Sequence, residues 1–67
     1  MIKNNLSKIM GEKRINMVKL SELTGLSRNA IFQLYHDKTS QITFDTINKM
    51  CTALQCTTQE LFEYIPD

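Results

Sequence analysis

The chain has 67 residues, of which 42% are hydrophobic and 22% charged, and its formal net charge is +1. A chain of this length can bury only one hydrophobic core, and this balance is typical of a globular domain rather than a disordered tail. No apolar run approaches the ~18 residues of a membrane-spanning helix, and from the charged, amphipathic start we expect no signal peptide. We therefore expect one cytoplasmic domain over residues 1–67, with no membrane partner.

The first helix is predicted over residues 2–13. Four apolar residues recur there at spacings of four, three and one, which places them on one side of a helix with lysines on the other. They are Ile2, Leu6, Ile9 and Met10.

A second, short helix is predicted after Asn16, whose side-chain oxygen can accept from the free backbone donors at a helix start. It carries Val18, Leu20 and Leu23. It is expected to end at Gly25, because glycine takes the left-handed conformation that a helix end often needs.

The third helix must begin almost at once, since only Leu26 separates Gly25 from Ser27, which is its predicted N-cap. Ile31 and Leu34 form its inward face. Two short helices joined by a three-residue turn must cross steeply.

A polar loop is expected from His36 to Gln41, and the strongest helical pattern begins after Thr43. Five apolar residues spaced three, three, one and three apart predict a fourth helix whose apolar stripe faces the core. They are Phe44, Ile47, Met50, Cys51 and Leu54.

A fifth helix is predicted to begin at Thr57, because Glu60 three residues later completes a capping box. Three apolar residues form one side of it before Pro66 ends it. They are Leu61, Phe62 and Ile65. No alternating run predicts a strand, so the expected fold class is all-α, with five helices.

The two cysteines, Cys51 and Cys56, lie five residues apart, a spacing that matches no metal or redox motif. We interpret both as reduced, small, buried apolar residues of the last two helices. The single histidine, His36, is distant in sequence, so a zinc site would lack ligands. No cofactor or small-molecule ligand is expected.

Charge is distributed unevenly along the chain. Residues 1–40 carry seven basic and three acidic side chains, a net charge of +4, whereas residues 41–67 carry one basic and four acidic side chains, a net charge of −3. A basic half of this kind is suited to facing a polyanion, although two ordinary solvated faces would give the same split.

The segment MVKLSELTGLSRNAIFQL, residues 17–34, resembles the helix-turn-helix motif of the Cro/cI-type (XRE) family. The matching positions are Leu20, Ser21, Gly25, Leu26, Ile31 and Leu34. The resemblance extends over nearly the whole chain, since a similar helix precedes the motif and the following segment, ITFDTINKMCTALQCTTQELF, is similar too. It implies a lambda-repressor-like DNA-binding domain with five helices and its motif at about residues 17–35.

The resemblance also implies a sequence-specific regulator of transcription that binds double-stranded DNA, and a repressor is expected rather than an activator. In this family the second helix of the motif enters the major groove. Its base-reading positions correspond to Arg28, Asn29 and Gln33. Arginine pairs bidentately with guanine, and asparagine or glutamine with adenine. Phe32 either touches a thymine methyl group or packs under the following loop.

Phosphate contacts are expected on both sides of the reading helix, at Asn16, Ser27, Lys38, Thr39 and Ser40. The alternative is that these residues do not contact phosphate. Asn16 and Ser27 would then act only as helix caps, and Lys38, Thr39 and Ser40 would be ordinary solvated loop residues. Lys38 is the strongest candidate among them.

A homodimer on DNA is expected, because one short reading helix covers too few base pairs to specify a site. Members of the family commonly pair through their C-terminal region. Leu61, Phe62 and Ile65 are the candidates, although the first two also fit the core.

Three positions depart from the family pattern. Met17 stands where a DNA-contacting glutamine is common, Ser21 where alanine is usual, and His36-Asp37 where an Asn-Gly pair usually closes the helix. Met17 removes a hydrogen-bonding group, and Asp37 brings negative charge near the expected phosphate path. These departures weaken the expected DNA contacts rather than the fold.

The alternative function is a protein-interaction module on the same fold with DNA binding weak or lost, which the near-neutral charge and Met17 favour. An enzyme is not expected. No nucleophile lies at a usable spacing from a base, and two glycines cannot build a phosphate-binding loop.

Overall fold

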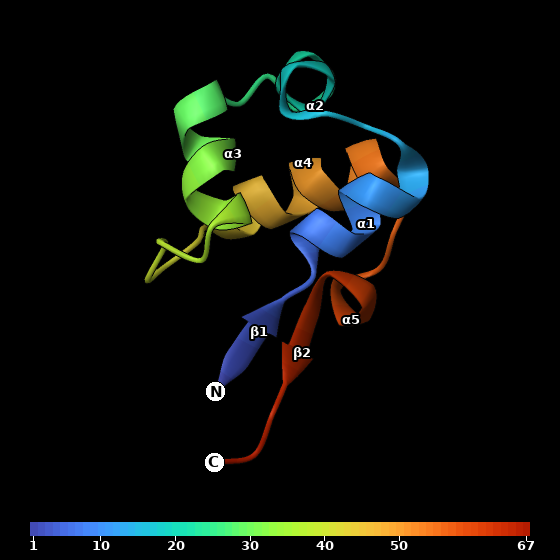
Figure 1. The fold of residues 1–67 in the computed structure, drawn as a ribbon. Helices are drawn as coiled ribbons and strands as arrows, with labels where there is room; N and C mark the ends of the chain where they lie inside the picture. Colours follow the sequence, from blue (N-terminus) through green and yellow to red (C-terminus); the bar gives the residue numbers. More distant parts are fainter.

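The computed structural model describes residues 1–67, which form five helices and two short strands. The helices are α1 (Leu6–Lys13), α2 (Met17–Thr24), α3 (Arg28–Tyr35), α4 (Phe44–Leu54) and α5 (Thr58–Leu61), and the strands are β1 (Ile2–Asn4) and β2 (Phe62–Tyr64). α2 and α3 stand at one end of the molecule, while the strands and both chain termini lie at the other (Figure 1). The prediction of five helices is confirmed, but the expectation of no strand is wrong.

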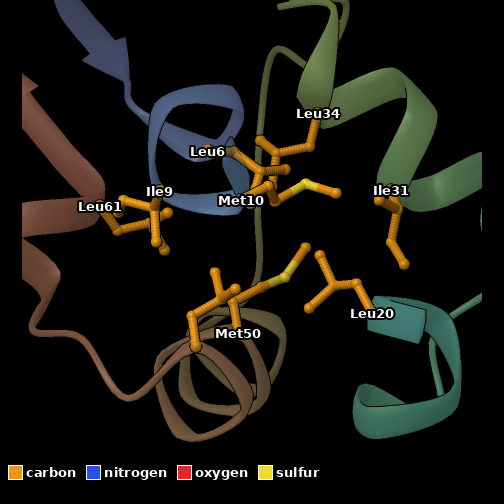
Figure 2. Packing of buried hydrophobic residues seen from close by; sticks show 9 residues of the cluster. Leu6, Ile9, Met10, Leu20, Ile31, Leu34, Met50 and Leu61 are labelled. Carbon is orange, nitrogen blue, oxygen red and sulfur yellow. The ribbon is translucent and has the colours of Figure 1, made fainter. Parts of the chain in front are cut away.

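A single hydrophobic cluster joins the five helices. Its buried side chains are Leu6, Ile9, Met10, Leu20, Ile31, Leu34, Met50, Leu54 and Leu61. In Figure 2, the Met50 side chain of α4 points towards Leu20 of α2 and Met10 of α1. All nine lie on the apolar faces that the spacing predicts, so the buried core was predictable from helical periodicity.

The first strand replaces the expected start of the first helix. β1 pairs antiparallel with β2, in the register Ile2 to Tyr64, Lys3 to Glu63 and Asn4 to Phe62. The Asn4 side chain accepts from the Leu6 N–H at 3.1 Å and donates to the Leu34 carbonyl at 3.0 Å. These bonds hold the bend between β1 and α1, so the helix begins only at Leu6.

The fifth helix is a single turn, and the expectation that it continues to Ile65 is wrong. Phe62 is already extended, with φ −124° and ψ 144°. β1 supplies backbone partners for this segment, and the Ile65 N–H donates to the Met1 carbonyl at 2.8 Å. Aromatic and β-branched residues favour this extended state. Pro66 therefore follows a strand instead of ending a helix.

The apolar stripe of α4 turns away from the core at its first residue. Met50 and Leu54 are buried and Ile47 is half-buried, but Phe44 is 90% exposed. A step of three residues stops about 60° short of a full turn, so two such steps rotate Phe44 roughly 120° from Met50. The prediction that Phe44 faces the core is wrong for this reason.

Four other apolar residues are more exposed than their patterns suggest. Val18 and Leu23 are exposed because α2, at one end of the molecule, buries only one side. Cys51 and Cys56, expected to be buried, are half-buried at the corner between α4 and α5.

The helix starts agree with the sequence. The predicted N-caps are confirmed, since Asn16 accepts from the Lys19 N–H at 2.8 Å and Ser27 from the Ala30 N–H at 3.1 Å. α4 begins directly after Thr43, which caps it.

Three helices end in a way that the sequence did not indicate. Arg14, Asp37 and Gln55 adopt left-handed backbone conformations with φ of 56°, 56° and 52°. In each case the next N–H donates back to a carbonyl five residues earlier: Ile15 to Met10 at 3.0 Å, Lys38 to Gln33 at 2.8 Å and Cys56 to Cys51 at 3.1 Å. This is the Schellman motif, which usually has glycine at the left-handed position.

Replacing Thr57 by alanine is expected to lower the free energy of unfolding by about 0.5 to 2 kcal/mol. Thr57 accepts from the Glu60 N–H at 3.1 Å, and Glu60 accepts from the Thr57 N–H at 2.9 Å. Urea denaturation measures the change, with the exposed neighbour Thr58→Ala as the control.

The same capping box predicts a dependence on pH. The backbone hydrogen bond from Thr57 lowers the pKa of Glu60, so the stabilisation from this carboxylate is present at neutral pH and is lost as the pH falls through the acid range. Equal stability of wild type and Thr57→Ala at neutral pH would contradict the role of the box.

Candidate nucleic-acid interface

The turn between α2 and α3 is fixed by three residues. Gly25 has φ 76°, a left-handed conformation that favours glycine, and its N–H donates to the Ser21 carbonyl. The Ser21 hydroxyl donates to the Leu26 carbonyl at 2.6 Å. The Thr24 hydroxyl donates to the Leu20 carbonyl at 2.7 Å and accepts from the Leu26 N–H at 3.1 Å. The backbone of the turn is therefore held on both sides.

The two helices of the motif cross steeply, as predicted. In Figure 1, α2 is seen along its axis while α3 is seen from its side. Leu20 of α2 and Ile31 of α3 are completely buried and join the same core (Figure 2). The outer face of α3 is consequently presented at the end of the molecule, away from the β strands.

The first turn of α3 carries two of the predicted reading residues, Arg28 and Asn29, and both are exposed. Ile31 and Leu34 take the buried side of the helix, as expected. The amide and guanidinium groups are thus free to meet a ligand beyond the molecular surface.

Gln33 occupies a different environment from the other predicted reading residues. It is half-buried and lines a groove of about 370 Å³ between α3 and the start of α4. Thr39, Thr43 and Thr46 contribute polar atoms to the same groove. The structure therefore brings Gln33 together with one predicted loop residue, Thr39, and two threonines that were not predicted.

Phe32 lies against the residues that follow α3. Its ring centroid is 4.4 Å from that of His36, and the Lys38 ammonium lies 5.6 Å from the Phe32 ring centroid. Such an ammonium–ring contact is attractive because the face of the ring carries partial negative charge. Packing against the loop is therefore present, and Phe32 still remains 41% exposed.

The predicted phosphate-contacting residues are all exposed. Asn16 and Ser27 each use the side-chain oxygen to cap a helix. Lys38, Thr39 and Ser40 follow α3 in the loop.

Basic side chains of the first forty residues are electrostatically unpaired. The structure has two ion pairs, between Lys49 and Asp45 at 3.0 Å and between the Met1 amino group and Asp67 at 3.1 Å. Neither involves a lysine or arginine from α1, α2, α3 or the loop after α3. Apart from Lys13, whose charge acts on Glu60 and Cys56, these cations have no partner charge that competes with an external anion.

No three His, Cys, Asp or Glu side chains come together as a metal site would need. None of the helices is long and apolar enough to cross a membrane.

A family model for the Cro/C1-type helix-turn-helix DNA-binding domain matches residues 5–67. The chain belongs to this family of DNA-binding domains. The resemblance inferred from residues 17–34 is thereby confirmed over almost the whole chain. Comparison with curated proteins gave no match.

Two departures of this Cro/C1-type domain from the family pattern have a structural explanation. Ser21 adds a hydroxyl that bonds the turn carbonyl of Leu26. Asp37 occupies the left-handed position at the end of α3, which aspartate tolerates better than most residues. The Asp37 carboxylate accepts a hydrogen bond from the Asn4 amide of β1.

The sequence did not identify three exposed residues of this Cro/C1-type domain: Ala30 on α3, and Thr43 and Phe44 at the start of α4. Ala30 and Thr43 line the groove that Gln33 borders, and Phe44 follows Thr43 as the first residue of α4.

Proposed function

We propose that this domain is a sequence-specific regulator of transcription that reads the major groove of double-stranded DNA with α3. One observation carries the proposal. Arg28 and Asn29 are exposed on the first turn of α3, and the buried residues Ile31 and Leu34 hold this helix against the core. The major groove is about 12 Å wide and admits one helix. Repression is the favoured output, because a bound domain blocks access to its site without any further activity.

The side chains of α3 match the chemistry of base edges. The Arg28 guanidinium is suited to the two acceptors of guanine, while the Asn29 and Gln33 amides are suited to the donor and acceptor of adenine. Phe32 has enough exposed ring for a thymine methyl group, although its packing on His36 restricts its movement. Gln33 would read from the groove between α3 and α4.

Phosphates on either side of the reading helix would be held by flanking groups. The N-terminus of α2 at Asn16 and that of α3 at Ser27 present backbone donors, which attract phosphate oxygens. Lys38 supplies a full charge after α3, next to Thr39 and Ser40. The Asp37 carboxylate accepts a hydrogen bond from the Asn4 amide, which limits the repulsion between this carboxylate and the same phosphates.

The functional unit on DNA is proposed to be a homodimer. With eight residues, α3 is about 12 Å long and reaches only one half-site. Leu61, one expected dimer contact, is completely buried in the core. Ile2 and Tyr64, 65% and 67% exposed and directly opposite each other on β1 and β2, are the better candidates.

A protein-interaction module remains the second candidate function. Met17 favours it, because the side chain packs against the core and offers no hydrogen bond at the start of α2. The two functions differ in their response to salt. Phosphate contacts release counterions on binding, whereas a protein-binding surface has none to release.

Binding to duplex DNA is expected to weaken steeply as salt rises, and Lys38→Ala is expected to flatten that dependence by about one unit of log affinity per unit of log salt. Lys49→Ala is the matched control, because Lys49 already pairs with Asp45 at 3.0 Å. Fluorescence anisotropy over a salt series measures both. The stoichiometry at saturation is expected to be two chains per duplex. Binding that ignores salt would instead support the protein-interaction module.

A further inference from the structure

Cys51 and Cys56 are brought together by the way α4 ends. Gln55, between them, is left-handed, and the Cys56 N–H donates to the Cys51 carbonyl at 3.1 Å. In this helix ending, the two residues joined by that bond commonly place their side chains in contact. An apolar pair usually occupies these positions, and here they hold two thiols.

The surroundings give the two thiols different roles. Both are free, half-buried and packed against the hydrophobic core. Burial, the neighbouring Cys51, with which it shares a hydrogen bond, and Glu60 together raise the pKa of the Cys56 thiol to about 11, while Lys13 opposes them. Cys56 therefore stays protonated at neutral pH, which disfavours it as the sulfur that reacts first.

We propose that Cys51 and Cys56 form a dithiol site that a small disulfide oxidant, such as glutathione disulfide, converts to an intramolecular disulfide. A disulfide requires α-carbons about 4.4 to 6.8 Å apart. The backbone hydrogen bond of 3.1 Å from Cys56 to Cys51 holds the two residues close together across the helix end, as such a bridge needs.

The reaction has two exchange steps. The Cys51 thiolate attacks one sulfur of the oxidant, which breaks the oxidant's S–S bond and releases one small thiolate. Cys56 then loses its proton to solvent and attacks the Cys51 sulfur of the mixed disulfide, which expels the second small thiol. Two cysteine thiols are oxidised by two electrons in total, and one oxidant molecule is reduced to two thiols.

The disulfide would fasten the corner between α4 and α5. The corner lies between Leu54 and Leu61 of the core, whereas α4 lines the groove beside α3 only as far as Met50. Oxidation should therefore leave α3 and its exposed residues in place. The site would let the domain pass between reduced and oxidised states with its DNA-facing surface unchanged.

Mass spectrometry of the native chain treated with glutathione disulfide tests the proposal. The wild type is expected to lose two hydrogen atoms per chain with no retained glutathione, and the closing step should accelerate as the pH rises towards the pKa of Cys56. Cys56→Ser is expected to stop at one glutathione on Cys51. Cys51→Ser should react severalfold more slowly than Cys56→Ser, because burial, the largest cause of the raised pKa of Cys56, still acts on the remaining thiol.

Circular dichroism of both variants checks that they fold, and the wild type in urea shows how each thiol behaves without the helix end. Native wild type that retains glutathione as Cys56→Ser does, or that forms only disulfides between chains, would overturn the proposal. Closure that is no faster in the native chain than in urea would overturn it as well.

Discussion

Replacing Leu20 by alanine is expected to lower the free energy of unfolding by about 2 to 5 kcal/mol. Leu20 is 0% exposed and reaches from α2 towards Met50 of α4 (Figure 2). Alanine would remove three buried carbon atoms and leave a cavity among residues of three helices. At about 0.05 to 0.15 kcal/mol per residue, a domain of 67 residues has only about 3 to 10 kcal/mol in total, so a large part of its stability would be lost.

Leu23 on the same helix provides a matched control. It is 48% exposed, and Leu23→Ala removes the same atoms from a site that solvent already reaches. The expected loss is less than about 1 kcal/mol. Urea denaturation of the two variants and the wild type gives the comparison. Equal losses would mean that α2 does not present Leu20 to the core.

Replacing Arg28 or Asn29 by alanine is expected to cost about 1 to 3 kcal/mol of binding free energy on the preferred DNA site. Non-specific binding should change much less, because each variant removes a hydrogen-bonding group from a base edge while the phosphate contacts remain. Gln33→Ala is expected to have the same effect, although Gln33 lies in the groove between α3 and α4.

Asn48→Ala is the control for Asn29→Ala. Asn48 is an exposed asparagine on α4, outside the motif. Its replacement should leave affinity and base preference unchanged. Binding titrations on the preferred site and on unrelated duplex DNA separate the two effects. A loss that is equal on both DNAs would place Arg28 or Asn29 on the backbone instead of the bases.

The core and the helix-turn-helix could be predicted from the sequence because their signals are local. Leu20, Ile31 and Met50 follow the helical period, and Gly25 marks the only turn that requires a left-handed glycine. The caps at Asn16 and Ser27 need only residues three positions away.

The strands could not be predicted because their signal is not local. Ile2 and Tyr64 pair across almost the full length of the chain, and a strand of three residues is too short to show alternation. The fifth helix is short for the same reason. The backbone of residues 62–64 pairs with β1 and therefore cannot continue the helix.

The candidate site was predictable in part. Arg28 and Asn29 were identified through the motif and are exposed at the start of α3. The groove beside Gln33 was not, because it depends on how the loop before α4 folds back. Spacing alone likewise concealed the contact between Cys51 and Cys56, since five residues do not share a helix face unless the helix ends between them.

Selection of bound sequences from a random duplex library tests the central claim most directly, when it is done in parallel with wild type and with Asn29→Ala. The wild type is expected to enrich one motif in two half-sites about 34 Å apart. Asn29→Ala should enrich the same motif with preference relaxed at one or two base pairs in each half. No enriched motif with the wild type, or an identical motif with Asn29→Ala and with variants at Arg28 and Gln33, would contradict reading by α3.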